Sequence, residues 1–398
     1  EPLSDEDNAT INAAKIVYGN EGATVAEIIE NIAAVNAITL GEMNSPVAGR
    51  FYRIISGNNK YLAINATDGT ATMQDKKVND KDNNGAETVF YYDGSYLVSV
   101  RTGLVLGDFF TSGANKFVHK DATGAASKVI IKGGAIEGKY QICTDQDVLR
   151  NGTRQDIFIS WGNNVAMGSV ATGTNVPGNL TAFYWTVEEL PLGSGYRWLP
   201  LYVGTDAKHV TVFSPVQLSN SETTTRIAEV HTLYVNPAKN TELVKTPIDD
   251  KVIPANTPCY VVLADGAVGA NGSVYLPFNY SETAPQVTEP NALTGSFYAT
   301  QKDGSKSYFT VGVDTDSKVR FMSHSAEYIP GFTAHYAVTE NPAEKYEVLD
   351  AKDATSGISE VVAGGENGAK VIYDLQGRRV ANASKGIFII NGVKTLVK

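Results

Sequence analysis

The chain has 398 residues, of which 42% are hydrophobic and 19% charged, and its formal net charge is −10. This chain is longer than one ordinary hydrophobic core supports, so its length predicts two or three domains. The apolar content excludes wholesale disorder. The acidic balance excludes an electrostatic nucleic-acid binder, which needs clustered lysines and arginines to displace counterions.

The N-terminal segment, residues 1–45, contains the one helix that the sequence predicts. Thr24 and Glu27 have the spacing of a capping box, in which two side chains satisfy free backbone amides reciprocally. The helix that begins there would have apolar residues along one face. This apolar stripe needs a partner, which would be the following β domain or sequence upstream of Glu1. The chain begins without an apolar leader, and we expect that a signal sequence has been removed. The stripe has helical spacing and consists of Val25, Ile28, Ile29, Ile32 and Ala33.

Residues 46–190 contain short alternating strands separated by turns of Gly, Asn and Asp. A strand at 50–55, a turn at 57–59 and a strand at 60–64 form the first unit, and residues 88–98 repeat the pattern. Many short strands at even spacing predict an all-β barrel or sandwich.

The same region resembles a known family. Phe-Tyr-Arg-Ile-Ile at 51–55, followed by Asn-Lys-Tyr-Leu-Ala-Ile at 59–64, is similar to the opening repeat of ricin-B-like β-trefoils, and residues 183–189 resemble their last strand. The resemblance implies a β-trefoil over residues 46–190. It does not extend to galactose-type binding, because the Gln-x-Trp signature of sugar-binding ricin repeats is missing from every repeat.

Residues 191–355 form a second β region, for which we expect a Greek-key-like β-sandwich. Its prolines lie between strand-like runs or at their starts, where no ladder donor is needed. The run 252–257 before a strand is similar to a module that follows trefoils in secreted gut-bacterial proteins. The two cysteines, Cys143 and Cys259, lie beside apolar residues in different predicted domains, which favours buried free thiols over a disulfide.

Residues 356–398 combine a linker with a C-terminal β segment. The linker is rich in Gly, Ser and Ala. Asn391-Gly392 between two apolar runs is the strongest short-range signal for a two-residue hairpin turn, since both turn residues adopt positive φ. Gly377 predicts a further turn. The tract is therefore predicted to form three short strands, which on geometry alone would simply finish a β domain.

Its residue pattern adds a second resemblance. Tyr-Asp-Leu-x-Gly-Arg-x-Val from Tyr373, Lys-Gly-Ile-aromatic-Ile-Ile from Lys385 and the closing run 393–398 resemble the C-terminal sorting domain of secreted Bacteroidetes proteins, the type IX secretion family, in a shortened form. The resemblance implies residence outside the cell or on its outer surface. No run of 18 apolar residues exists, so the sequence predicts no membrane span.

Motifs of common catalysis are missing from the sequence. It contains no Gly-x-Ser-x-Gly elbow, no His-Glu-x-x-His, no phosphate-binding loop and no Cys-x-x-Cys. Of its five histidines, His324 and His335 are closest in sequence, and solvated loop and strand positions explain them better than a metal pair. Glu188 and Glu189 are neighbours on one strand, so they point to opposite faces and cannot form a glycosidase pair alone.

Two patterns suggest ligands. Asp80, Asp82 and Asn84 match the start of a calcium-loop pattern, but the pattern then fails, and a polar hairpin tip explains the same residues, so we expect no cofactor. Trp161 with Asn163 and Asn164 could stack on a sugar and bond its hydroxyls. The parity of Trp161 with two isoleucines of its strand instead favours a core position.

We therefore expect a mainly β protein with an N-terminal helix, a β-trefoil, a β-sandwich-like domain and a C-terminal β-hairpin segment. Its expected function is binding or adhesion at the cell surface, with a glycan or surface polymer as partner and no catalysis. Two alternatives stay open. The chain could be the accessory C-terminal region of a larger exported hydrolase, or a purely structural surface protein.

Overall fold

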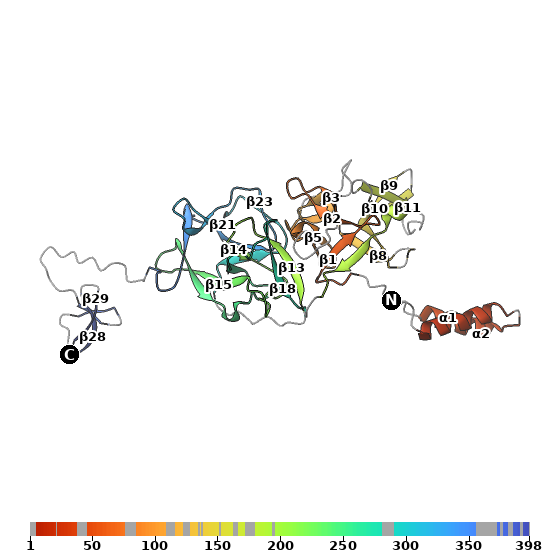
Figure 1. Cartoon of the computed structure of the whole chain (residues 1–398), viewed down its shortest axis with the longest axis horizontal. Coiled ribbons are helices and arrows are strands. Elements are labelled where there is room, and N and C mark those ends of the chain that lie inside the picture. The colour runs from red at the N-terminus through yellow and green to blue at the C-terminus, as the bar shows by residue number, and fades with distance from the viewer. Residues whose placement is uncertain are drawn as a thin grey trace.

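The computed structural model confirms a mainly β chain with several sheets (Figure 1). Among the residues that the structure describes, α-helices occur only near the N-terminal end, and three single-turn 3-10 helices lie between strands. These residues are 5–20, 22–37, 46–75, 85–108, 116–121, 128–133, 136, 138–150, 153–161, 166–171, 180–192, 196–280, 290–355, 372–374, 377–380, 385–390 and 393–397.

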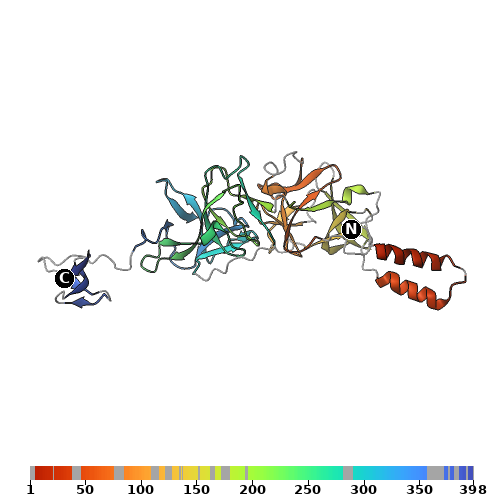
Figure 2. The same cartoon turned by 60° about the horizontal axis from the view of Figure 1, so that its bottom comes forward.

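The N-terminal segment is a pair of helices, α1 (Asp5–Tyr18) and α2 (Val25–Ala37), which stand apart from the strands in Figures 1 and 2. The predicted capping box begins α2: Thr24 N donates to Glu27 Oε2 at 2.8 Å, and Glu27 N donates to Thr24 Oγ1 at 3.3 Å. The sequence pattern did not predict α1, which begins with four polar residues and has alanine at three of its seven apolar positions. The helix that packs on α2 is therefore α1, and much of the apolar stripe of α2 stays exposed.

Strands β1 to β12 pair as in a β-trefoil, which confirms the expected class. In the ring, β1 pairs with β4 and β12, β4 pairs with β5, and β8 pairs with β9. Tyr140 of β9 pairs with Trp185 before β12, and Val129 N of β8 donates to Ser95 O at 2.8 Å, which closes the ring. Three hairpins, β2–β3, β6–β7 and β10–β11, extend β1, β5 and β9. The bounds are β1 (Arg50–Ile55), β2 (Lys60–Ile64), β3 (Ala71–Asp75), β4 (Phe90–Tyr92), β5 (Leu97–Ser99), β6 (Val105–Asp108), β7 (Lys116–Val118), β8 (Val129–Gly133), β9 (Tyr140–Arg150), β10 (Thr153–Ser160), β11 (Ala166–Ala171) and β12 (Thr186–Glu189).

A hydrophobic core fills the centre of the trefoil. Trp185 is its largest fully buried side chain, and its Nε1 donates to Ile159 O at 3.2 Å, so the one polar atom of the indole is satisfied. Phe90 and Phe117 stack with their ring centroids 5.5 Å apart. Apolar and polar residues alternate along the sequence of these strands because every second side chain of a strand points into the core.

The second β region is built on one sheet in the order β14-β17-β15-β16-β25-β22-β21-β24-β19, in which only β16 and β25 are parallel. The sheet curls over, so that β14 at one edge meets β24 near the other. Thr211 Oγ1 of β14 donates to Ala334 O of β24 at 2.6 Å, and Phe213 N donates to Phe332 O at 3.0 Å. Its two halves therefore face each other across a core, as in a sandwich. The bounds are β13 (Arg197–Tyr202), β14 (His209–Val212), β15 (Ile227–Val235), β16 (Glu242–Pro247), β17 (Cys259–Leu263), β18 (Ser273–Phe278), β19 (Leu293–Ser296), β20 (Thr300–Gln301), β21 (Ser307–Val313), β22 (Val319–Ser323), β23 (Tyr328–Ile329), β24 (Thr333–Val338) and β25 (Lys345–Leu349).

The trefoil and the second β region share a hydrophobic core. Phe51 of β1 lies edge-on to Phe278 of β18 with ring centroids 5.6 Å apart, and Tyr91 of β4 does the same with Phe297 at 5.1 Å. One buried cluster contains residues of both regions. Burial of apolar surface is the dominant stabilising term in folding, so this shared cluster holds the two regions together.

Backbone contact at Gly103 completes this junction. Ala299 N donates to Gly103 O at 2.8 Å, and Gly331 N donates to Thr102 O at 2.9 Å. A Cβ atom on Gly103 would lie 2.5 Å from both Ala299 N and Gly331 Cα, and the φ of Gly103 is +75°. Both the close approach and the positive φ require glycine.

A buried carboxylate ties the far end of the second region. Glu242 lies at the start of β16 and is only 2% exposed. Its oxygens accept hydrogen bonds from Thr355 N at 2.8 Å, Thr355 Oγ1 at 2.5 Å, Asn236 Nδ2 at 2.7 Å and Lys239 Nζ at 3.1 Å. The contacts join residues 236–242 to the last described residue before the linker.

The C-terminal tract forms a sheet of its own in the order β27-β26-β28-β29. Ile390 pairs with Val393 across the predicted two-residue turn, whose own residues lie outside the described part. Gly377 has φ +75° and donates from N to Asp374 O at 3.0 Å, so the second predicted turn is present and splits the first predicted strand in two. The bounds are β26 (Ile372–Tyr373), β27 (Arg379–Val380), β28 (Gly386–Ile390) and β29 (Val393–Val397).

Candidate functional site

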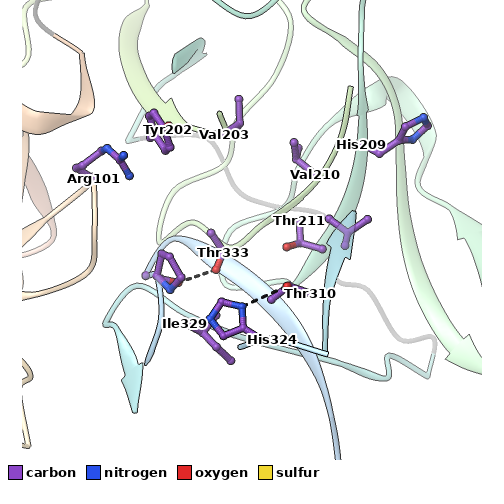
Figure 3. Close-up of a pocket in the computed structure, with 13 residues that line it drawn as sticks. Arg101, Tyr202, Val203, His209, Val210, Thr211, Thr310, His324, Ile329 and Thr333 are labelled. Atoms are coloured by element: carbon purple, nitrogen blue, oxygen red, sulfur yellow. Dashed lines mark hydrogen bonds between the residues drawn. The ribbon is translucent and has the colours of Figure 1, made fainter. Parts of the chain in front are cut away.

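A cleft of about 260 Å³ lies where the trefoil meets the second β region (Figure 3). Arg101, which follows β5, is the residue that the trefoil contributes to the described lining. The other residues come from the second region, and the full lining is Arg101, Tyr202, Val203, His209, Val210, Thr211, Thr310, Val311, His324, Ile329, Pro330, Gly331 and Thr333.

A tight turn places Arg101 in the cleft. Gly103 N donates to Ser99 O at 2.7 Å, and Arg101 N donates to Ser99 Oγ at 3.2 Å. The same turn makes the backbone contacts of Gly103 with the second region. The position of the guanidinium therefore depends on the junction between the two regions.

The Arg101 guanidinium is held over an aromatic ring. Its central carbon lies 3.2 Å from the ring centroid of Tyr202, a cation–π contact, and Figure 3 shows the two side chains next to each other. Nε lies 3.7 Å from Glu87 Oε1, an ion pair that is too long for a hydrogen bond. Burial lowers the pKa of Arg101, but an arginine stays charged at neutral pH. The cleft thus contains one fixed cation.

His324 follows β22 and is oriented by two partners. Its Nε2 lies 2.9 Å from Tyr328 O, which can only accept, so Nε2 carries the proton. Its Nδ1 lies 3.3 Å from Thr310 Oγ1, and in the neutral ring it accepts from that hydroxyl. Figure 3 shows this contact in the lower part of the cleft.

His209 begins β14 at the end of the view opposite Arg101 (Figure 3). Its Nδ1 lies 2.7 Å from the hydroxyl oxygen of Tyr260, and the two rings stack with centroids 6.0 Å apart. Burial, together with the charges of Lys208 and Lys245, lowers the pKa of His209. The imidazole is therefore neutral at neutral pH.

Threonine hydroxyls supply the other polar groups of the cleft. Thr333 Oγ1 donates to Pro330 O at 2.6 Å, and Thr211 Oγ1 donates to Ala334 O. A hydroxyl whose proton is donated to a carbonyl still has lone pairs that accept from a ligand. No Asp or Glu occurs among the described residues that line the cleft. Its chemistry is one cation with neutral donors and acceptors.

Trp161, the aromatic candidate from the sequence, packs at the edge of the trefoil core. Its Nε1 donates to Tyr184 O at 2.8 Å, and a Cβ on Gly57 would lie 2.5 Å from its Cζ2. The indole is only partly exposed and adjoins the core cluster. These contacts agree with the core position that strand parity favoured. Its predicted companions Asn163 and Asn164 lie outside the described residues.

The predicted calcium ligands Asp80, Asp82 and Asn84 also lie outside the described residues. Among the residues that the structure does describe, no three His, Cys, Asp or Glu side chains gather as a metal site.

Two further sets of residues singled out from the sequence have structural partners. Glu189 forms ion pairs of 2.9 Å with both Arg50 and Arg197, which fits a structural carboxylate. The expected solvated position is wrong for His335, which is buried against Tyr308 with ring centroids 5.5 Å apart, and burial lowers its pKa to about 4. Both cysteines are buried free thiols, as expected.

The cleft itself was not predicted from the sequence. Its residues come from segments up to about 230 positions apart, and neither Arg101 nor the lining threonines belong to any motif. A scan against protein-family models finds no match to the chain, and a search of curated proteins finds no relative. In the described part of the chain, no helix is long and apolar enough to cross a membrane.

Proposed function

We propose that this chain is a secreted or surface-attached protein that binds carbohydrate in the cleft and catalyses no reaction. The observation that carries the proposal is the lining of the cleft: hydroxyl and imidazole groups around one guanidinium. Sugar hydroxyls both donate and accept hydrogen bonds, and the threonine hydroxyl oxygens of the cleft keep lone pairs that can accept from them. The site is also at a junction between two folded regions, where small-molecule sites preferentially occur.

The size of the cleft supports a small ligand. Its volume of about 260 Å³ is slightly below the range of about 300–1,000 Å³ that is typical of small-molecule sites. A single sugar residue, free or at the end of a chain, suits this volume better than an extended polymer.

The lining supports binding in preference to hydrolysis. Most glycosidases need two carboxyl groups on either side of the bond that breaks. The described lining of the cleft contains no carboxyl group, and Glu87, a carboxylate beside Arg101, forms an ion pair with it. Activity of a catalytic domain elsewhere in a longer protein would be a separate property of that domain.

The extracellular location rests on the resemblance of the tract 373–398 to sorting domains. Deletion of residues 371–398 should reduce delivery of the protein to the cell surface, measured by protease accessibility on intact cells. Unchanged delivery would remove the sorting role. A ricin-B-like origin of the trefoil likewise rests on the residues quoted above.

A glycan array tests the binding function. Purified protein is expected to bind a limited set of plant, host or microbial glycans, and heat-denatured protein serves as the control. Silence across all of them would favour a structural surface protein. A catalytic domain encoded directly upstream would favour an accessory region of an exported hydrolase.

A further inference from the structure

We infer that the cleft selects a sugar residue that carries a carboxylate, such as a hexuronic acid, and that Arg101 recognises the carboxylate. The inference rests on the proposed carbohydrate-binding function and names its ligand class. It follows from the geometry around the guanidinium and from the charges of the lining.

One edge of the Arg101 guanidinium is available to a ligand. Glu87 lies on the Nε side of Arg101, and Tyr202 covers one face of the group. Among the described residues, neither terminal nitrogen of Arg101 donates a hydrogen bond. The side chain keeps 20% of its surface exposed. The edge formed by the two terminal nitrogens is therefore the part of the cation that a ligand can reach.

The shape of the guanidinium matches that of a carboxylate. A guanidinium presents its N–H donors in a planar fork, and a carboxylate matches that fork with two parallel hydrogen bonds. The contact with Tyr202 and the turn at Ser99 and Gly103 fix the orientation of Arg101 before a ligand arrives. Preorganisation of this kind increases affinity, because less side-chain freedom is lost on binding.

The charge of the described cleft lining favours an anionic ligand. The whole chain has a net charge of −10, and yet the described lining of the cleft has one cation and no carboxylate. An anionic ligand therefore meets attraction at this place and no neighbouring acidic side chain within the lining. Glu87 lies on the Nε side of the guanidinium, so it reduces this attraction and leaves the terminal nitrogens to the ligand.

Other groups of the cleft suit the hydroxyls of the sugar. Thr310 and Thr333 line the same cleft with hydroxyl oxygens that can accept from sugar hydroxyls, and His324 holds the hydroxyl of Thr310 in place. A neutral sugar offers the terminal nitrogens of Arg101 only uncharged hydroxyl oxygens, which do not form the paired, charge-assisted hydrogen bonds of a carboxylate. A uronic acid satisfies both sets, which is the physical basis of the expected preference.

The experiment uses two sugars that differ in one group. Methyl β-D-glucuronide and methyl β-D-glucoside, and the corresponding galacto pair, are titrated into the full chain by isothermal calorimetry at neutral pH. The acidic member of at least one pair is expected to bind ten times or more tightly than its neutral partner. Arg101→Gln should weaken uronide binding by ten times or more, and should leave the weak neutral binding unchanged.

A matched control separates the cleft from total charge. Arg226 also lies over an aromatic ring, Trp198, at 5.6 Å, but it does not line the cleft. Arg226→Gln removes the same charge and should keep uronide affinity within a factor of two. Circular dichroism of both variants checks that they are folded. If Arg101→Gln fails to fold, Thr310→Val should still weaken uronide binding, because it removes a hydroxyl of the same cleft.

The outcomes separate the two proposals. Equal binding of uronides and neutral glycosides would overturn the acidic preference and leave carbohydrate binding supported. Uronide binding that is unaffected by Arg101→Gln would overturn the role of Arg101. No binding of any of the four sugars by folded protein, together with a silent glycan array, would overturn both the ligand class and the carbohydrate function.

Discussion

Replacing Glu242 by Gln should destabilise the second β region by about 3 kcal/mol at pH 7. Burial alone would raise the pKa of this carboxyl, but hydrogen bonds from Thr355, Asn236 and Lys239 outweigh it and lower the pKa to about 2 from its ordinary 4.5. A difference of 2.5 pKa units corresponds to about 3 kcal/mol of preference for the charged form, as an order-of-magnitude figure. Glutamine presents an NH₂ group to donors, so it loses this preference and leaves donors unpaired.

The pH dependence has a defined sign. The folded pKa of Glu242 lies below the unfolded value, so its contribution is fully present above about pH 4.5 and is lost as the pH falls towards 2. In wild type, roughly 2 of the ~3 kcal/mol should be gone at pH 3. The difference between wild type and Glu242→Gln should therefore shrink at pH 3.

Urea unfolding followed by tryptophan fluorescence and far-UV circular dichroism, at pH 7 and pH 3, measures this difference. Glu340→Gln is the matched control, because that side chain is exposed and should change the unfolding free energy by no more than about 0.5 kcal/mol. A loss below ~1 kcal/mol for Glu242→Gln at pH 7, or an equal loss at both pH values, would refute the reasoning from a charged, fully bonded carboxylate.

Three further predictions concern the junction, an acid-sensitive side chain and the trefoil core. Gly103→Ala should cost about 3 kcal/mol or more in thermal unfolding, because its Cβ meets Ala299 N and Gly331 Cα at 2.5 Å, and a normal melting temperature would contradict that contact. His335 has a folded pKa of about 4 against 6.5 unfolded, so the unfolded state binds more protons. Stability should thus fall from about pH 6.5 down to 4, by up to ~3 kcal/mol, and His335→Gln should flatten that slope in unfolding free energy against pH. Trp161→Ala should lower the unfolding free energy by about 2–4 kcal/mol and leave sugar affinity unchanged, whereas loss of binding in a still folded variant would restore this indole as a ligand contact.

The strands of the trefoil could be predicted because each places alternate residues in one core. Ile54 and Leu62 are fully buried at positions where the sequence pattern expects core residues. The capping box at Thr24 was likewise predictable, since the signal is local. The helix Asp5–Tyr18 was missed because its first four residues are polar and three of its seven apolar residues are alanines, which leaves a weak apolar stripe, and its partner is another helix of the same segment.

The cleft could not be predicted, because tertiary packing alone assembles it. Arg101 enters it through the turn that ends at Gly103, and His209 and His324 are brought near by the curled sheet of the second region. None of these residues stands at a spacing that signals a ligand. Of the residues that did attract attention in the sequence, His324 lines the cleft, whereas for Trp161 the structure supplies a packing role.

The apolar core that joins the trefoil to its neighbour limits how this protein can be divided and how it can evolve. Separation of the chain near residue 192 would expose Phe51 on one fragment and Phe278 on the other to water, so each fragment should aggregate when produced alone. Recombination that exchanged one region without its neighbour would meet the same penalty. The two regions should therefore be inherited together as a single unit.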